Sequence, residues 1–362
     1  MTPQEAGELA ELRHFERKRG RKFTPKQRQE ILHSLGIGLG IGLGVNSGMN
    51  AGGIAFASLG WTGLEQLFQS DIGLAYDATA VATSGNTSTT AITISTIPTT
   101  APCALLVKAT NSATIPAATF SIYADGGTTP FMTGVTPTAG TPIALTGVGT
   151  GVSLTWSAGT GVTNDTWKAA AAQWNDQAAS PHHGTASGTA RPIITPGTGG
   201  KLGLLGNGTT TTLATTLALP AAPATTNQYV YLLARMTATP GGNASLCGVP
   251  GGSFVGIYCT SAPSIVQYNG SLVNGSTPTI NTWYLMAAKF TGSTSDSMQL
   301  GSAAAVSGAS AGNGTPAGGF YYFSSLGSFF APCEIMMVAV ATSPAPAGFR
   351  AAVTSWCGVT QV

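Results

Sequence analysis

Charged side chains are concentrated at one end of this chain. The first 30 residues carry 13 of its 28 acidic and basic side chains, eight basic and five acidic. Over the whole chain only 8% of residues are charged, against about a quarter in an ordinary globular protein. The sequence therefore predicts a small charged segment that attaches to another molecule, followed by a large, nearly uncharged body exposed to solvent.

The composition of the body limits what it can do. Hydrophobic residues make up 43% of the 362-residue chain, enough for two or three domains with cores of their own. After residue 30 the basic and acidic side chains number seven and eight, so the body has no excess positive charge to neutralise phosphates. A role in nucleic-acid binding would have to reside in the N-terminal segment.

The charged segment, residues 1–34, predicts two short helices. Thr2-Pro3-Gln4-Glu5 supplies an N-cap, a proline at the first helical position and a capping-box glutamate, and Thr24-Pro25 begins a second helix in the same way. These helices have too few apolar residues to fold alone, so we expect them to dock on a partner. The residues expected to anchor the segment are Arg13, Arg17, Lys18, Arg19, Arg21, Lys22, Ile31, Leu32 and Leu35.

Glycine dominates the next stretch, residues 35–70, which we predict to be a hinge or stalk. From Leu35 to Val45 aliphatic residues and glycines alternate strictly. Whether the backbone is extended or helical, one face consists of glycine and admits another backbone at short range. The segment therefore suits identical chains stacked about an axis, and a flexible linker is the alternative. It is too rich in glycine to be expected to span a membrane or to act as a secretion signal.

From residue 71 onward the pattern is of short β-type runs interrupted by Gly, Pro and Thr, which predicts a mainly β fold of sandwich or barrel type. We expect a small β-domain over residues 71–165 and a larger one over 166–362. A brief helix is predicted over 167–174, and a closing helix over 347–356. The predicted strands are 90–97, 104–109, 119–123, 143–145, 152–157, 201–205, 229–236, 253–259, 264–268, 282–290, 297–300, 319–323 and 335–341.

Two stretches resemble known families. Residues 120–127 (FSIYADGG), 149–160 (GTGVSLTWSAGT) and 164–167 (NDTW) resemble small β-domains of bacteriophage structural proteins, although Gly161 and Asn164 depart from the usual pattern.

The second resemblance is to the concanavalin A-like, laminin-G-type jelly roll. It is carried by residues 173–177 (QWNDQ), 182–186 (HHGTA), 191–192 (RP), 204–208 (LLGNG) and 281–288 (NTWYLMAA), and by the closing strand and helix. Gly206 and Asn207 stand where that family has an aspartate, which weakens a calcium site carried over from it.

Together the two resemblances imply a bacteriophage virion protein, a tail or head fibre. Its N-terminal segment would attach to an adaptor, nozzle or capsid protein of the virion, and its C-terminal domain would bind a host-surface glycan or protein. A homo-oligomer is expected, most simply a trimer. The alternatives are a capsid-decorating protein that stabilises the particle, a virion-associated polysaccharide depolymerase and a secreted bacterial lectin.

No catalytic residue, metal site or cofactor is expected. The eight acidic residues of the body are scattered without the paired spacing that a glycoside hydrolase uses, and His182-His183 reads as a polar loop. Cys103 and Cys333 are expected in the core, and Cys247 and Cys259 could form a disulfide under oxidising conditions. The ligand-binding candidates are the aromatic side chains beside turns, whose rings can stack on sugars: Tyr268, Tyr321 and Tyr322.

Overall fold

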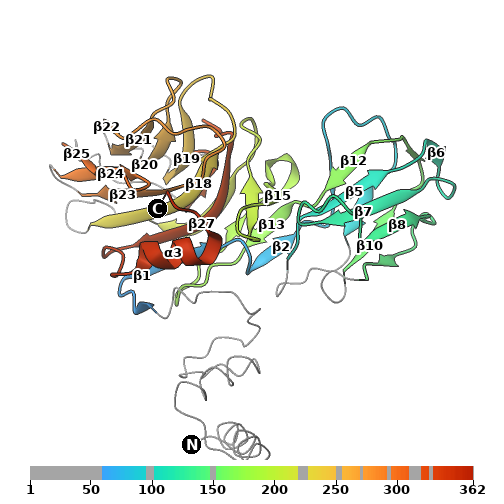
Figure 1. Ribbon diagram of the computed structural model, residues 1–362, viewed down its shortest axis with the longest axis horizontal. Helices are drawn as coiled ribbons and strands as arrows, with labels where there is room; N and C mark the ends of the chain where they lie inside the picture. The colour runs from blue at the N-terminus through green and yellow to red at the C-terminus, as the bar shows by residue number, and fades with distance from the viewer. Residues whose placement is uncertain are drawn as a thin grey trace, which may run out of the picture. The chain divides into compact units, whose positions relative to one another are not determined.

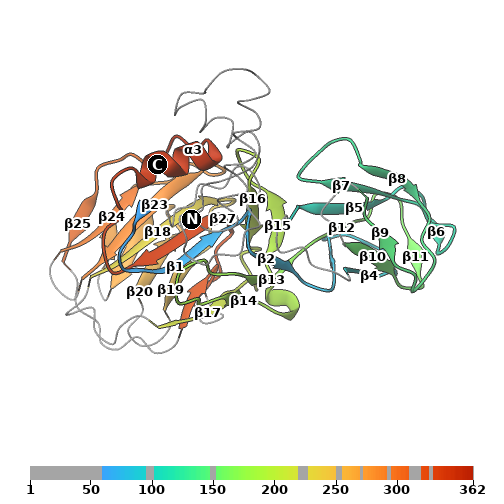
Figure 2. The same cartoon turned by 90° about the horizontal axis from the view of Figure 1, so that it is seen from below.

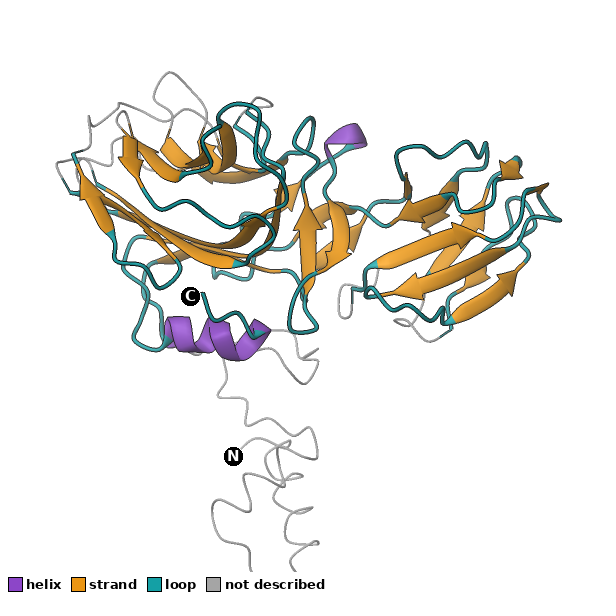
Figure 3. Cartoon of the chain, turned by 45° about the horizontal axis from the view of Figure 1, so that its top comes forward, coloured by secondary structure: helices purple, strands orange, loops and turns teal. Residues whose placement is uncertain are grey.

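The computed structural model describes residues 59–94, 102–146, 152–218, 227–249, 255–269, 272–291, 295–309, 319–325 and 329–361. The chain divides between Gly52 and Gly53, and every described residue belongs to the second unit. The predictions for the charged segment 1–34, with its nine anchoring residues, and for the glycine repeat lie outside the described residues. Within the described residues the protein is built of antiparallel strands and one α-helix, α3 (Phe349–Cys357), as Figures 1 and 3 show. The predicted mainly β fold and the closing helix are confirmed.

Three sheets form a small β-lobe from the first part of the described chain. They are a five-stranded sheet in the order β3-β12-β5-β7-β8, a three-stranded sheet in the order β4-β10-β9, and the pair β11-β6. Their strands are β3 (Val81–Ala82), β4 (Ile92–Ile94), β5 (Leu105–Ala109), β6 (Ala113–Thr114), β7 (Phe120–Ala124), β8 (Met132–Val135), β9 (Ile143–Ala144), β10 (Ser153–Trp156), β11 (Thr160–Gly161) and β12 (Thr166–Lys168).

The core of this lobe is aromatic. Phe120 lies between Trp156 and Trp167, with ring centroids 5.4 and 6.0 Å apart, and all three side chains are buried. On β5 the buried residues alternate with half-buried ones, the period of two that a sheet with one covered face requires. The strand was predicted as a short β-type run over residues 104–109.

The larger part of the described chain is a sandwich, and its first layer is an eight-stranded sheet. The order is β15-β16-β27-β18-β23-β24-β25, and β1 also pairs with β27. The strands are β1 (Leu64–Gln69), β15 (Ile193–Pro196), β16 (Leu202–Leu205), β18 (Gln228–Met236), β23 (Tyr284–Phe290), β24 (Asp296–Leu300), β25 (Val306–Gly308) and β27 (Cys333–Ala341).

The second layer is a nine-stranded sheet in the order β2-β13-β14-β17-β26-β19-β20-β21-β22. Figure 2 shows the two layers one above the other, with α3 on the outer side of the eight-stranded sheet. The strands are β2 (Leu74–Tyr76), β13 (Ala171–Trp174), β14 (Gly184–Thr185), β17 (Leu213–Ala218), β19 (Ala244–Val249), β20 (Val255–Cys259), β21 (Ile265–Asn269), β22 (Leu272–Asn274) and β26 (Gly319–Tyr322).

Both faces of the eight-stranded sheet are covered, but by different elements. Residues such as Leu232 and Met286 point into the core shared with the nine-stranded sheet. The alternate residues, such as Leu233 and Leu285, join a second core beneath α3. A strand covered on both faces reads as a continuous apolar run, and β27 is buried at all nine positions.

The predicted helix over residues 167–174 is wrong, because this segment forms β12 and β13. The alanines between Trp167 and Trp174 favour a helix, but both segments find strand partners on two sides. Trp167 is buried in the small lobe beside Phe120, and Trp174 stacks on Phe68 at 4.8 Å in the sandwich. Burial of two large rings in two places outweighs the local preference.

The described end of the predicted hinge or stalk belongs to the sandwich. Leu64–Gln69 is β1, paired in antiparallel register with Met337 to Ala341 of β27. This strand was not predicted from the sequence, because its pairing partner is distant in the chain: Phe68, for example, pairs with Val338. The division of the chain into residues 1–34, 35–70, 71–165 and 166–362 stays a prediction. The structure shows in addition that β1, within residues 35–70, pairs with the sandwich.

The five cysteines are all buried and free, so Cys247 and Cys259 do not form the disulfide that the sequence left open. Each sits on an inner strand of the nine-stranded sheet. The predictions that Cys103 and Cys333 are core residues are confirmed. Among the described residues, the structure contains no helix with the length and apolar character needed to span a membrane.

Candidate functional site

The outer face of the eight-stranded sheet is only partly covered by α3, and the uncovered part carries polar side chains. On β18, β23 and β24 the residues that point outward form two rows across the strands. One row pairs Tyr229 with Lys289 and Lys289 with Ser297. The next row pairs Tyr231 with Ala287 and Ala287 with Gln299, two residues further along each strand.

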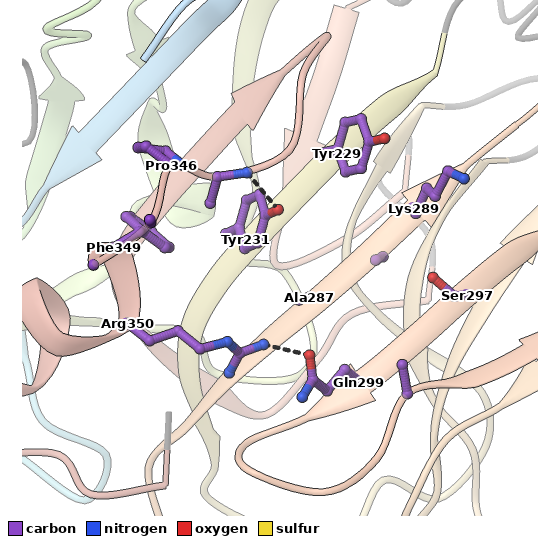
Figure 4. Close-up of a pocket in the computed structure, with 14 residues that line it drawn as sticks. Tyr229, Tyr231, Ala287, Lys289, Ser297, Gln299, Pro346, Phe349 and Arg350 are labelled. Atoms are coloured by element: carbon purple, nitrogen blue, oxygen red, sulfur yellow. Dashed lines mark hydrogen bonds between the residues drawn. The ribbon is translucent and has the colours of Figure 1, made fainter. Parts of the chain in front are cut away.

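These rows form the floor of a pocket of about 410 Å³ (Figure 4). Its wall is the segment Ala345 to Arg350, which leads into α3 and includes its first two residues. The floor of the pocket is lowest at Ala287, because the short side chain of this residue lies between the larger side chains of Tyr231 and Gln299. The volume falls in the range of small-molecule sites in proteins.

Tyr231 is a fixed wall of the pocket. Its ring packs edge-on against Trp61 and Phe349, with centroids 5.4 and 5.2 Å away. Its hydroxyl accepts a hydrogen bond of 2.9 Å from the Ala345 amide. Burial raises the pKa of Tyr231 above its usual value, so the group stays a neutral phenol at physiological pH.

Tyr229, by contrast, is half-buried at the end of the second core. Because Tyr229 and Tyr231 are two residues apart on one strand, both rings project from the same face. A partly exposed aromatic ring beside polar groups is the arrangement by which proteins contact the apolar face of a sugar or another flat ligand.

Two cations line the pocket. Lys289 extends from the floor, and Arg350 extends from the first turn of α3 toward the sheet (Figure 4). The guanidinium of Arg350 donates to the Gly301 carbonyl at 3.1 Å and to Gln299 Oε1, which fixes its position over β24. Burial lowers the pKa of Arg350 below its usual value, but a guanidinium is so weak an acid that it stays charged at physiological pH.

The residues predicted from sequence to bind a ligand lie on the other sheet. Tyr321 and Tyr268 are half-buried on β26 and β21, and three pairing steps through Gly248 and Gly256 separate them. The prediction that Tyr322 binds a ligand is wrong. Its side chain is fully buried, and its hydroxyl donates to Gln66 Oε1 within the core. Its ring therefore has no face free for a ligand.

The pocket residues escaped sequence analysis because they come from three distant segments. Tyr229-x-Tyr231 and Lys289 fall inside predicted strands, so the outward face of each strand was readable. The sequence did not show that β18 pairs with β23, or that α3 returns over that pair of strands. Only this register brings Tyr229, Lys289 and Arg350 together.

The described lining of the pocket contains no carboxylate. Asp176, in the segment 173–177 that resembles the jelly-roll family, has a structural role. It is buried and accepts hydrogen bonds from the amides of Leu67, Ala178 and His182 at 2.7–2.9 Å, which ties its loop to β1. His183 Nδ1 accepts from the Asp176 amide at 3.0 Å. Within the described residues, no three acidic, histidine or cysteine side chains are placed to hold a metal ion.

No protein-family model matches this chain, and no curated protein matches it in sequence. Solved structures give distant likenesses. A Trypanosoma rangeli sialidase in complex with the inhibitor DANA shares 9% identity over 51% of this chain and 30% of its own, with a TM-score of 0.35. The binding domain of botulinum neurotoxin DC in complex with SialylT shares 9% identity over 47% of this chain and 45% of its own, with a TM-score of 0.33.

A mutant GH54 α-L-arabinofuranosidase soaked with 4-nitrophenyl α-L-arabinofuranoside shares 10% identity over 80% of this chain and 63% of its own, with a TM-score of 0.40. The chain spans 28% and 30% of the length of two Trypanosoma rangeli sialidase structures and 53% of a third. Likenesses this distant concern β-sheet architecture, and we draw nothing about the ligand of this chain from them.

Proposed function

We propose that this protein is a non-enzymatic, glycan-binding component of a bacteriophage virion. In this proposal residues 1–34 attach to an adaptor, nozzle or capsid protein, and the sandwich binds a host-surface glycan. The observation that carries the binding half of the proposal is the pocket between α3 and the outer face of the eight-stranded sheet. The virion half rests on the charged N-terminal segment and on the resemblance of the sequence to phage proteins.

The lining of the pocket suits a sugar. Tyr229 offers a ring to the C–H face of a pyranose, while Ser297 and Lys289 offer groups that pair with hydroxyls. Tyr231 and Arg350 are held in place by contacts with the protein, so part of the site is preorganised, which lowers the entropic cost of binding. The absence of a carboxylate among the described lining residues supports binding without cleavage, because glycoside hydrolysis commonly needs a carboxylate pair.

The binding half is tested by replacing one aromatic ring on the eight-stranded sheet and, in separate variants, two on the nine-stranded sheet. Purified full-length protein carrying Tyr229→Ala, and separately Tyr268→Ala and Tyr321→Ala, is assayed for binding to surface polysaccharide extracted from a susceptible host. We expect Tyr229→Ala to weaken binding about 10-fold or more, and the other two variants to bind like the parent. Loss of binding with Tyr268→Ala or Tyr321→Ala, while Tyr229→Ala binds normally, would move the site to the nine-stranded sheet and refute the assignment.

The virion half is tested by deleting residues 2–33. We expect the truncated chain to fold, because the described residues, which begin at residue 59, have buried cores of their own, and to be missing from purified particles. Incorporation of the truncated chain at the normal copy number would refute the proposed anchor. A trimer, which we expect from the glycine-faced segment 35–45, is tested by measuring the mass of the full chain in solution.

A further inference from the structure

The pocket has a charge balance unlike that of the rest of the described protein. Seven basic side chains follow residue 30, and three of them form ion pairs: Arg191, Lys201 and Arg235. Four of the seven have no ion pair with a described residue, and two of these four, Lys289 and Arg350, line the same pocket.

Two like charges in one pocket repel each other and are stabilised by an opposite charge between them. No acid lines the pocket among the described residues, so the described lining does not supply this opposite charge. The neighbouring groups add to the positive potential. Helix α3 begins at Phe349 with no acidic residue in its first turn, and its N-cap residue, Gly348, lines the pocket. A helix N-terminus carries a partial positive charge and favours an anion.

The positions of the two cations suggest which part of a ligand each would contact. Two N–H groups of Arg350 donate hydrogen bonds to Gly301 and Gln299. Its main contribution to ligand binding would therefore be a positive charge held in place on the side of the pocket next to α3. Lys289 makes no hydrogen bond or ion pair with a described residue, and its ammonium has three donors to offer. It lies in the same row as Tyr229, so a sugar resting on that ring would place a ring substituent near the ammonium.

We propose that the pocket binds an acidic glycan, in which the carboxylate of a sugar acid pairs with Lys289 in the field of Arg350 while the sugar ring rests on Tyr229. This inference rests on the proposed function and narrows it from glycans in general to sugars that bear a carboxylate. An ammonium that donates to a carboxylate forms a charge-assisted hydrogen bond, which is about twice as strong as a hydrogen bond between neutral groups.

The test uses three matched ligands and full-length protein. The ligands are a trisaccharide of galacturonic acid, its carboxyl-reduced form, which is neutral, and a sulfated galactose trisaccharide. Affinities are measured by isothermal titration calorimetry at 50 and 500 mM NaCl. We expect the acid to bind at least 10-fold more tightly than its reduced form at 50 mM, and the difference to shrink at 500 mM because salt screens the charge.

The protein variants are Lys289→Gln, Lys289→Arg and, as a matched control, Lys168→Gln, which removes a lysine of the small lobe that has no described ion pair. Lys289→Gln should remove the preference for the acid, so that the acid and its reduced form bind with similar affinity. Lys289→Arg should keep most of the preference, and Lys168→Gln all of it. Thermal melts of each variant show whether the fold is intact.

Equal binding of the acid and its reduced form, or tighter binding of the sulfated sugar, would overturn the inference. If the acid and its reduced form bound equally to the parent protein and Tyr229→Ala abolished binding of both, the proposed function would stand while the inference fell. If none of the three ligands bound, the inference would fall, and the proposed function would be judged by the host-polysaccharide assay. An unchanged preference in Lys289→Gln would also overturn it.

Discussion

The ion pair between Arg235 and Glu334 gives the sharpest stability prediction. Glu334 is the second residue of β27 and its side chain is only 2% exposed, whereas that of Arg235 on the neighbouring strand β18 is 27% exposed. Arg235 Nε and the terminal nitrogen approach Glu334 Oε2 at 2.8 and 2.6 Å, and Thr195 donates to Oε1 at 2.6 Å. The guanidinium also lies 4.9 Å from the ring of Trp283. The perturbation is Arg235→Met, which keeps much of the side-chain length and removes both donors to Oε2.

The expected cost follows from what the carboxylate loses. Removing one partner of a buried pair costs about 3–5 kcal/mol, and the partial exposure of Arg235 lets water replace some of the contact, so we expect about 3 kcal/mol. A cation over an aromatic ring near the surface adds about 0.5–1 kcal/mol, which methionine recovers in part through contact with Trp283. For a sandwich of about 200 residues, 1 kcal/mol lowers the melting temperature by about 2–4 °C, so the predicted fall is about 6–12 °C.

The assay is urea and thermal unfolding followed by tryptophan fluorescence. The matched control is the double variant Arg235→Met with Glu334→Met, which removes both charges and should lie within about 1 kcal/mol of the parent, because replacing a whole buried pair is often neutral. Arg235→Met alone should therefore be less stable than the double variant. A single variant within 1 kcal/mol of the parent would refute the view that Glu334 depends on Arg235 in the folded state.

Three further predictions concern titration. Burial raises the pKa of Glu65, so the folded state binds its proton more tightly than the unfolded chain, and the stability from this group is lost as pH rises through the folded pKa. Glu65→Gln should be more stable than the parent at pH 7.5 and equal to it below pH about 4, as urea midpoints at the two pH values would show; a variant less stable at pH 7.5 would contradict this. Asp165 accepts hydrogen bonds from Ser88 and its pKa is lowered, so its contribution is present above the unfolded pKa and lost as pH falls through the folded one. Asp165→Asn should destabilise the small lobe at pH 7 and have less effect at pH 3; an equal effect at both would count against the carboxylate. Burial raises the pKa of Cys247 to about 12 and of Cys259 to about 11, so a thiol reagent at pH 7.5 should react slowly with the native protein and with five thiols after unfolding without reductant, whereas three thiols would indicate a disulfide.

Much of the strand pattern could be read from the sequence, because each strand carries its own signal. Val230, Leu232 and Ala234 face one core while Tyr231 and Leu233 face the other, and such runs of β-branched and aromatic residues predict strands whatever their partners. The error at residues 167–174 shows the limit of local signals. Four consecutive alanines favour a helix, and only the cores that receive Trp167 and Trp174 determine that this segment pairs as strands.

The candidate site was less readable, because it depends on register. Tyr229, Lys289 and Gln299 each look like ordinary surface residues of predicted strands, and nothing local shows that they share a face with Arg350. The residues predicted from the sequence were tyrosines beside turns instead. The prediction for Tyr322 is wrong because this residue of β26 points into the core. An alternation of residues tells which side chains share a face of one strand, but the order of strands in a sheet has no such signal.

The most direct test of the account is a structure of the protein soaked with the galacturonic acid trisaccharide. We predict density for a sugar ring against Tyr229, with its carboxylate within hydrogen-bonding distance of Lys289. Sugar density over Tyr321 and Tyr268 on the nine-stranded sheet, with the pocket beside α3 left empty, would contradict it.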